Sequence, residues 1–222
     1  MPRIARGLVD GFVYHVMNRG NGRQHVFRKD QDYDSFIKIM SNAQSRHRVS
    51  ILAFCVMPNH FHMLLKPTKG RELSHWMQWL MTSHVRRYHR HYKGSGHVWQ
   101  GRFKSFIVQQ DDHLLTVARY IERNPVRAGL VKTAQGWNWS SHLERCGLKP
   151  THLLSELNIE LPRNWQDYVD TPLTAKELER VRQSVKRQSP YGNSDWQKEI
   201  CSELGLGSTI NSRGRPRKKG KK

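Results

Sequence analysis

The segment VSILAFCVMPNHFHMLLKP, residues 49–67, determines the fold that the sequence predicts. It opens with a continuous apolar run that is typical of a buried β-strand, and residues 60–67 form a second run of the same kind. The Met-Pro-Asn step at 57–59 joins the two runs and is short enough for a hairpin-like connection. The segment therefore predicts two neighbouring strands that run antiparallel.

The segments on either side of this hairpin alternate between helix and strand patterns. Residues 11–20 are rich in β-branched and aromatic side chains and predict a strand. Apolar residues at three- and four-residue steps predict a helix from Asp30 to about His47. The same criteria predict a helix over 72–92, a strand over 97–109 and a helix over 111–124. This order predicts an α+β fold in which helices pack on an antiparallel sheet of ferredoxin-like character.

The composition divides the chain into three parts. We expect one main domain over residues 1–136, followed over 137–207 by a more polar extension with two peripheral helices at 173–188 and 195–206. The closing segment NSRGRPRKKGKK has no apolar side chain, so we expect a disordered basic tail over 208–222.

The charge of the chain points to a polyanionic partner. Its 222 residues carry a formal net charge of +20, from 38 Lys and Arg against 18 Asp and Glu. The final ten residues hold seven of the basic side chains and no acid, so the rest of the chain still carries +13. Nucleic acid is the commonest partner for such a field. A basic protein on a membrane surface is the alternative, although no helix combines a broad apolar face with a Lys-rich one.

Other features of the sequence favour a cytoplasmic protein with neither a membrane span nor disulfide bonds. No apolar run approaches the roughly 18 residues of a membrane span, and the first residues lack the apolar core of a signal peptide. Cys55, Cys146 and Cys201 are far apart, so we expect reduced, structural thiols.

Two histidines lie within the second strand of the hairpin. Side chains alternate along a strand, so His60 and His62 project from one face while Phe61 points to the other. The pair can share a metal ion. An isolated pair of this kind is more often structural, with its nitrogens bonded to backbone or water.

A second pattern lies in the helix at 111–124. Tyr120 and Asn124 are four residues apart and share one helix face, although they also fit a half-buried core aromatic and a helix C-cap. Two imidazoles and an amide oxygen would leave a divalent ion open positions for a phosphate oxygen. A neighbouring tyrosine could then attack phosphorus and form a covalent phosphotyrosine. A phenol ordinarily has a pKa near 10, so ionising it at pH 7 costs about 4 kcal/mol, which a nearby cation can offset. The segment offers Arg119, Arg123 and Arg127.

Four segments in order, MPNHFHMLL, WQGRFKSF, ARYIERNPVRAGLV and RGRPRK, resemble the REP-associated tyrosine transposases. These belong to the single-tyrosine HUH class and are related to the IS200/IS605 insertion elements. The resemblance runs along nearly the whole chain. It implies that His60 and His62 are metal ligands, that Tyr120 is the nucleophile and that Asn124 is the third ligand, where insertion-sequence relatives usually have Gln.

The resemblance also implies the reaction and its partners. The metal would be Mg²⁺ or Mn²⁺, and the product a 5′-phosphotyrosine on single-stranded DNA with a free 3′-OH on the other fragment. The substrate would be the hairpin of a repetitive extragenic palindrome with a short guide sequence at its foot. We expect a monomer that acts in the bacterial cytoplasm at the nucleoid.

Basic residues in several segments are candidates for holding this DNA. Between Lys66 and Gln110, nine Lys or Arg and one acid are interleaved with aromatic residues, as suits a single strand, although most of these aromatics fit the core equally well. His84, His89 and His91 are expected to be solvated or to face phosphate, and His15 to be a structural sheet residue. The tail has the form of an AT-hook, or of a polybasic segment without specificity. The predicted DNA-binding residues are Arg19, Asn21, Arg86, Arg87, Arg90, Arg102, Lys104, Arg213, Arg215 and Arg217.

Two other functions remain open at this point. A non-enzymatic protein that binds hairpin or AT-rich DNA would need the histidines only for structure. A nuclease that uses metal-activated water would cut DNA without Tyr120. No Asp or Glu in the motif segments is a candidate general base except Glu122, which points away from Tyr120 on a helix.

Overall fold

The computed structural model describes residues 7–211, and its centre is a four-stranded sheet. The strands lie in the order β2, β3, β1, β4, and every neighbouring pair is antiparallel. The predicted α+β fold with a ferredoxin-like sheet is therefore confirmed. The strands are β1 (Val13–Arg19), β2 (Val49–Met57), β3 (His60–Pro67) and β4 (Lys104–Val108).

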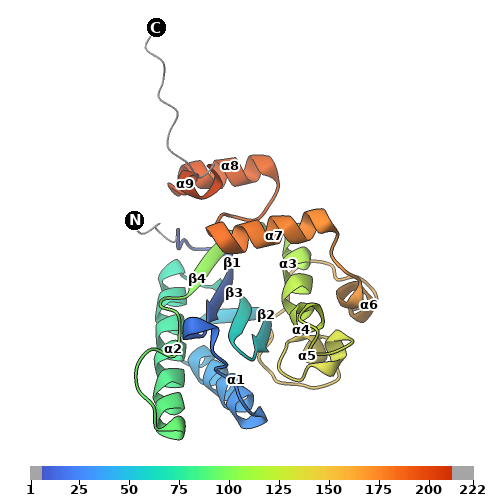
Figure 1. Ribbon diagram of the computed structural model, residues 1–222. Coiled ribbons are helices and arrows are strands. Elements are labelled where there is room, and N and C mark those ends of the chain that lie inside the picture. Colours follow the sequence, from blue (N-terminus) through green and yellow to red (C-terminus); the bar gives the residue numbers. More distant parts are fainter. Residues whose placement is uncertain (1–6, 212–222) are drawn as a thin grey trace.

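Helices cover both faces of the sheet (Figure 1). On one face lie α1 (Asp30–Gln44) and α2 (Gly70–Tyr92), and on the other lies α3 (Asp112–Glu122), which contacts α7 (Ala175–Arg187). The shorter helices are η1 (Asn21–Arg23), α4 (Asn124–Arg127), η2 (Ala134–Gly136), α5 (His142–Arg145), α6 (Trp165–Asp170), α8 (Ser194–Glu203) and α9 (Gly207–Ile210).

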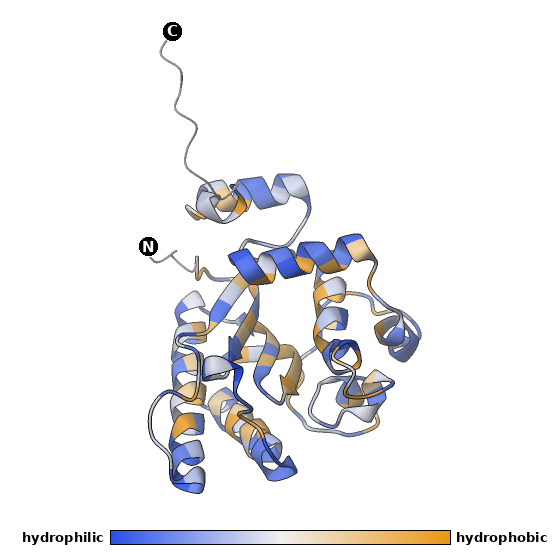
Figure 2. Ribbon diagram, viewed as in Figure 1, coloured by the Kyte–Doolittle hydropathy of each residue, from blue (hydrophilic) through white to orange (hydrophobic). Residues whose placement is uncertain are grey.

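The alternation of β3 separates an apolar core from a polar site. Phe61 points toward α1 and α2, where its ring centroid lies 5.4 Å from that of Phe36 and 5.3 Å from that of Trp99. His60 and His62 point to the opposite face, beneath α3. Figure 2 shows that hydrophobic residues gather in the sheet and on the helix faces around it, while α7 is largely hydrophilic.

Two predicted elements are shorter than expected. The strand predicted over 97–109 is regular only in β4, because Gly101 has φ +105°, a left-handed conformation that breaks an extended segment. The helix predicted over 111–124 ends as α3 at Glu122, and α4 begins at Asn124. Pro125 has no N–H and its ring would clash with the carbonyl four residues earlier, so a continuous helix is blocked.

The expectation that His84 is solvated was wrong. His84 lies on α2 within an aromatic cluster, where its ring centroid is 5.1 Å from that of Phe36, and it is 1% exposed. Neither ring nitrogen has a hydrogen-bond partner. Burial, with a smaller contribution from the charge of Arg87, lowers the pKa of His84 to about 3, so the ring is neutral at pH 7.

The C-terminal extension covers both edges of the sheet. Beside β2, Val56 donates its N–H to the carbonyl of Trp139 at 2.9 Å, and the N–H of Ser141 donates to β2 at the same distance. Beside β4, Tyr191 exchanges hydrogen bonds with Ile107 and Gln109 at 2.8 and 2.9 Å. Both edges thus gain partners for backbone groups that would otherwise be exposed. The proposed boundary between 136 and 137 stays a prediction.

A buried carboxylate joins α3 to the extension. Glu122 is fully buried and accepts hydrogen bonds from Ser141 at 2.6 Å, Trp165 at 2.7 Å and Arg145 at 3.1 Å, with His142 Nδ1 at 3.2 Å. Burial alone would raise its pKa, but these donors and the Arg145 charge together hold the pKa of Glu122 below its ordinary value. The ionised carboxylate therefore anchors the helix that carries Tyr120.

Other expectations concern cysteines, membranes and the tail. Cys55, Cys146 and Cys201 are free thiols. Within residues 7–211, no helix has the length and apolar character that crossing a bilayer requires. Arg213, Arg215 and Arg217 lie outside the described residues, as does most of the basic tail.

The neutral His84 predicts a measurable pH dependence of stability. The unfolded chain binds a proton at this residue with a pKa near 6.5, so stability is lost as the pH falls from 6.5 toward 3. When the pH falls from 7 to 5, the free energy of unfolding should decrease in both proteins, and the decrease should be about 2 kcal/mol smaller in His84→Phe than in wild type. Urea unfolding at both pH values measures the difference, with His91→Gln on the exposed part of α2 as the control. Equal losses in wild type and His84→Phe would contradict the assignment.

Candidate functional site

A cavity of about 580 Å³ opens between the sheet and α3, and it contains the predicted catalytic and metal-binding residues. Strands β1, β3 and β4 form its floor, α3 and α4 form one wall, and Val185 reaches it from α7. No carboxylate lines this cavity. Its lining includes eight residues that the sequence singled out: Arg19, His60, His62, Arg102, Lys104, Tyr120, Asn124 and Arg127.

The Nδ1 atoms of the two histidines contact residues that do not line the cavity. Nδ1 of His60 lies 2.6 Å from Oδ1 of Asn59, and Nδ1 of His62 lies 2.9 Å from Nε2 of His15. Asn59 Oδ1 only accepts, so His60 donates from Nδ1 and keeps a lone pair on Nε2. When His62 donates to His15 in the same way, both Nε2 lone pairs are free to bind a metal ion.

Burial keeps all three imidazoles neutral. It lowers the pKa of His60 to about 4, that of His15 to about 3 and that of His62 well below its ordinary value. The charges of Arg19 and Arg127 lower the pKa of His60 and His62 further. Protons therefore do not compete for the ligand atoms at pH 7, as a metal site requires.

Tyr120 and Asn124 face this pair from the opposite wall. The Tyr120 ring centroid lies 5.8 Å from that of His62 and 6.1 Å from that of His15, and Tyr120 is 5% exposed. The helix break at Arg123 does not separate Tyr120 from Asn124, since both still line the same cavity. The predicted residues thus come together from β3, α3 and α4.

Arg127 occupies the space between the phenol and the carboxamide. Its Nη2 donates to Oδ1 of Asn124 at 2.6 Å, and its guanidinium carbon lies 4.3 Å from the centroid of the Tyr120 ring. By contrast, Arg119 is paired with Glu177 at 3.1 Å, and Arg123 lines a smaller cavity on the other side of Tyr120. Of the three arginines that the sequence offered, Arg127 alone lines the cavity with the histidines.

The donor set fits a divalent cation. Two neutral imidazole nitrogens and an amide oxygen suit Mn²⁺ and other first-row metals, and Mg²⁺ with added water. The buried Nδ2 of Asn124 has no partner, and the Oδ1 atom, which Arg127 holds by one bond, has a second lone pair. These residues could therefore hold the ion that the sequence led us to expect.

Four other predicted DNA-binding residues of the described chain do not line the cavity: Asn21, Arg86, Arg87 and Arg90. Asn21 is exposed beside the end of β1, and Arg86 and Arg90 are exposed on α2. Arg87 is half-buried and paired with Asp32 at 3.3 Å, which leaves it less free to bind phosphate.

Sequence reasoning missed the role of His15. It treated this residue as structural, although His15 and His62 lie on adjacent antiparallel strands and project to the same face. The alternation of side chains along β1 places His15 on one face of the sheet. Only the register with β3 shows that this is the face of His62.

A second cluster with metal-ligand character also escaped sequence reasoning. Ligand atoms of His47, Glu72 and His75 lie within 4.8 Å of one another near the end of α1 and the start of α2, and His47 Nδ1 is 3.4 Å from Glu72 Oε2. Glu72 and His75 are one turn apart on α2, but nothing in the sequence relates them to His47.

Comparisons with known proteins agree with this geometry. Residues 8–124 match the family model described as "Transposase IS200 like". A protein of Haemophilus influenzae that carries the name REP-associated tyrosine transposase is 29% identical to this chain over 101 residues. The matched residues cover 40% of this chain and 57% of that protein. The match therefore spans little more than half of that relative's length.

Solved structures resemble the chain as well. A REP-associated tyrosine transposase bound to a REP hairpin superposes with a TM-score of 0.55 at 20% identity, covering 79% of this chain and 96% of the other. A crystal structure of an inferred transposase from Deinococcus radiodurans has a TM-score of 0.40 at 23% identity, covering 55% and 96%. The first likeness shows a shared fold.

The contact between His15 and His62 predicts an effect on metal affinity. In His15→Phe the Nδ1 proton of His62 loses its acceptor, so Mn²⁺ binding should weaken roughly 10- to 100-fold. His15→Gln supplies an acceptor oxygen and should recover part of the loss. Electron paramagnetic resonance of free Mn²⁺ measures the affinity, and His84→Phe, a buried histidine on the other face, is the matched control. Unchanged affinity in a folded His15→Phe protein would contradict the assignment.

Proposed function

The chain belongs to the family of IS200-like transposases, and we propose that it cuts and rejoins single-stranded DNA through a covalent bond to Tyr120. The observation that carries this proposal is the cavity itself, where Tyr120, His60, His62 and Asn124 converge from three elements. A structural role for the histidines would not require a tyrosine and an amide oxygen with an unused lone pair opposite them.

We propose hairpin DNA of the repetitive extragenic type as the substrate. Two relatives support this choice by their names, and one of them was solved with a REP hairpin bound. Arg19, Arg102 and Lys104 line the cavity and supply positive charge for the phosphates of a strand that enters it.

The metal site would consist of His60 Nε2, His62 Nε2 and Asn124 Oδ1. A Mg²⁺ or Mn²⁺ ion bound there would polarise the phosphate that is to be cleaved. In this site, Asn59 would hold His60, and His15 would hold His62, in the tautomer that keeps an Nε2 lone pair for the metal.

Tyr120 is the nucleophile in this proposal. Its phenol oxygen attacks phosphorus and the bond to the 3′ oxygen breaks. The fragment on the 3′ side of the break becomes attached to Tyr120 through its 5′ phosphate, and the other fragment keeps a 3′-OH. Water at the cavity mouth takes the phenol proton and protonates the departing 3′ oxygen. The reverse attack by a 3′-OH restores Tyr120 and rejoins the strand, so no nucleotide cofactor is needed.

Arg127 neutralises the charge that develops during this attack. Its guanidinium lies against the Tyr120 ring, and it has five N–H donors of which one is used on Asn124. The free donors can bind a non-bridging phosphate oxygen, as guanidinium groups commonly do. Glu122 takes no part as a base, because its oxygens are engaged by the donors of the extension.

The packing of α3 supports action as a monomer. This helix carries Tyr120 and packs on the sheet of its own chain, whose strand β3 carries His60 and His62. The excess of positive charge favours a location on DNA, and we propose that the protein works at the nucleoid in the cytoplasm.

Replacing Tyr120 by Phe tests the reaction. Wild-type protein incubated with a labelled hairpin oligonucleotide and Mn²⁺ should form an SDS-stable adduct with the fragment on the 3′ side of the break, attached through its 5′ phosphate. Tyr120→Phe should form none, because the nucleophilic oxygen is absent, while hairpin affinity stays within about twofold. Tyr168→Phe on α6 makes the same chemical change outside the cavity and should leave the adduct intact.

Each alternative has its own outcome in the same gel. Cleavage that persists in Tyr120→Phe would assign the reaction to metal-activated water. Hairpin binding without any adduct in wild type would leave a DNA-binding protein without the proposed chemistry.

A further inference from the structure

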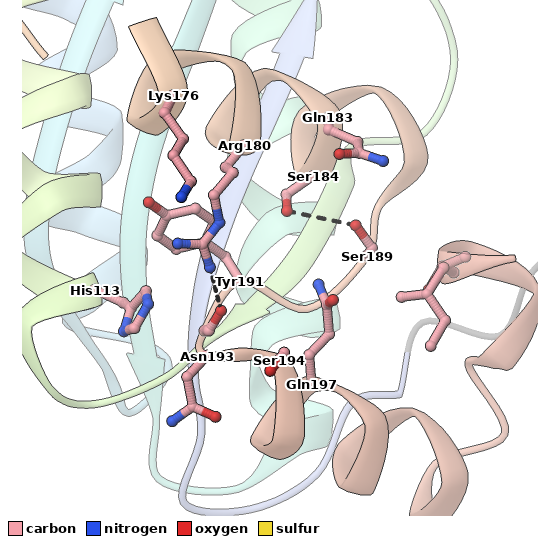
Figure 3. A pocket seen from close by; sticks show the side chains of 13 residues that line it. His113, Lys176, Arg180, Gln183, Ser184, Ser189, Tyr191, Asn193, Ser194 and Gln197 are labelled. Atoms are coloured by element: carbon pink, nitrogen blue, oxygen red, sulfur yellow. Dashed lines mark hydrogen bonds between the residues drawn. The ribbon is translucent and has the colours of Figure 1, made fainter. Parts of the chain in front are cut away.

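A second cavity, of about 440 Å³, lies in the C-terminal extension (Figure 3). Helix α7 borders both cavities, since Val185 lines the first and its neighbour Ser184 lines the second. Figure 3 shows Lys176, Arg180 and Ser184 projecting from α7 into the second cavity. Nothing in the proposed reaction uses these groups.

The charge in this cavity is positive and is not neutralised by its lining. Lys176 and Arg180 are one turn apart on α7, and none of the residues around them in the cavity is an Asp or Glu. Among the described residues, Lys176 makes no hydrogen bond or ion pair. Arg180 donates one bond to the carbonyl of Gly192, at 2.5 Å, and lies 5.4 Å from the Tyr191 ring, so it keeps further donors.

Two neighbouring cations are engaged elsewhere. Arg119 pairs with Glu177, and Arg187 donates to the backbone carbonyls of Ser208 and Asn211. Arg182 and Lys186 on α7 also make no ion pair among the described residues, but neither lines the cavity. Lys176 and Arg180 are therefore the α7 cations that lie among its polar groups.

The polar groups of the cavity are suited to phosphate oxygens. Asn193 uses its Oδ1 to cap α8, which leaves its NH₂ group free, and Gln183 projects from α7 beside Arg180. Ser184 and Ser189 are buried with their hydroxyl oxygens 3.4 Å apart. Ammonium, guanidinium, amide and hydroxyl donors together match the acceptor oxygens of a phosphodiester.

The two cavities lie along the same edge strand. Lys104 at the start of β4 lines the first, and Tyr191, which pairs with Val108 at the end of β4, lines the second. Five residues of strand span about 13 Å, a distance that one DNA strand can bridge.

We propose that the second cavity binds a backbone phosphate of the single-stranded DNA that flanks the cleaved position. This inference rests on the proposed function. It makes the extension a part of the DNA-binding surface and gives α7 contact with the DNA on both sides.

Lys176→Gln tests the proposal in a Tyr120→Phe background, which prevents cleavage. Fluorescence anisotropy would compare a bare hairpin with hairpins extended by single-stranded DNA on the 5′ or the 3′ side. For one of the two extensions, Lys176→Gln should weaken binding roughly three- to tenfold and reduce the salt slope by about one. Affinity for the bare hairpin should not change.

Lys186→Gln is the matched control, because it removes the same charge from α7 outside the cavity. Equal affinities of the two variants for every extended hairpin would overturn the inference while leaving the proposed function intact. Failure of bare and extended hairpins alike to bind would overturn both.

A second arm uses inorganic phosphate and deoxyadenosine monophosphate without DNA. Neither should bind at micromolar concentration. Lys176-dependent binding of either in that range would assign the cavity to a small anion and overturn the DNA assignment.

Discussion

The register between β1 and β3 is the constraint on which the site depends. Met17 pairs with His62 and His15 with Leu64, so the side chains of His15, His60 and His62 all project beneath α3. Phe61, between the histidines, fills the aromatic core on the other face. A slip of one residue would move the imidazoles into that core and Phe61 into the cavity, so burial of the apolar face also fixes the positions of the three histidines.

The helix that carries Tyr120 is held from outside the sheet domain. Glu122, two residues beyond Tyr120, is buried among donors from α5, α6 and the segment before them, and Arg119 pairs with Glu177 on α7. A buried carboxylate with this many partners is costly to disturb, because removing one partner leaves an uncompensated charge or donor. The extension therefore positions Tyr120 in addition to covering the edges of the sheet.

Local patterns predicted the fold and the faces that the candidate site residues share, and long-range contacts were not predictable. The apolar runs at 49–67 predict the hairpin, and the spacings of His60 with His62 and of Tyr120 with Asn124 predict shared faces. The role of His15 depends on strand register, and Arg127 could be chosen over Arg119 only from side-chain positions. The buried state of His84 depends on aromatic partners from three other segments, which helix spacing alone does not reveal.

The central claim is that two imidazoles and a carboxamide form one cation site beside a tyrosine. Diffraction data collected at the manganese absorption edge from Mn²⁺-soaked crystals locate the ion directly. The account predicts an anomalous peak within about 2.3 Å of His60 Nε2, His62 Nε2 and Asn124 Oδ1. A peak only at the cluster of His47, Glu72 and His75, or none near His60 and His62, would contradict it.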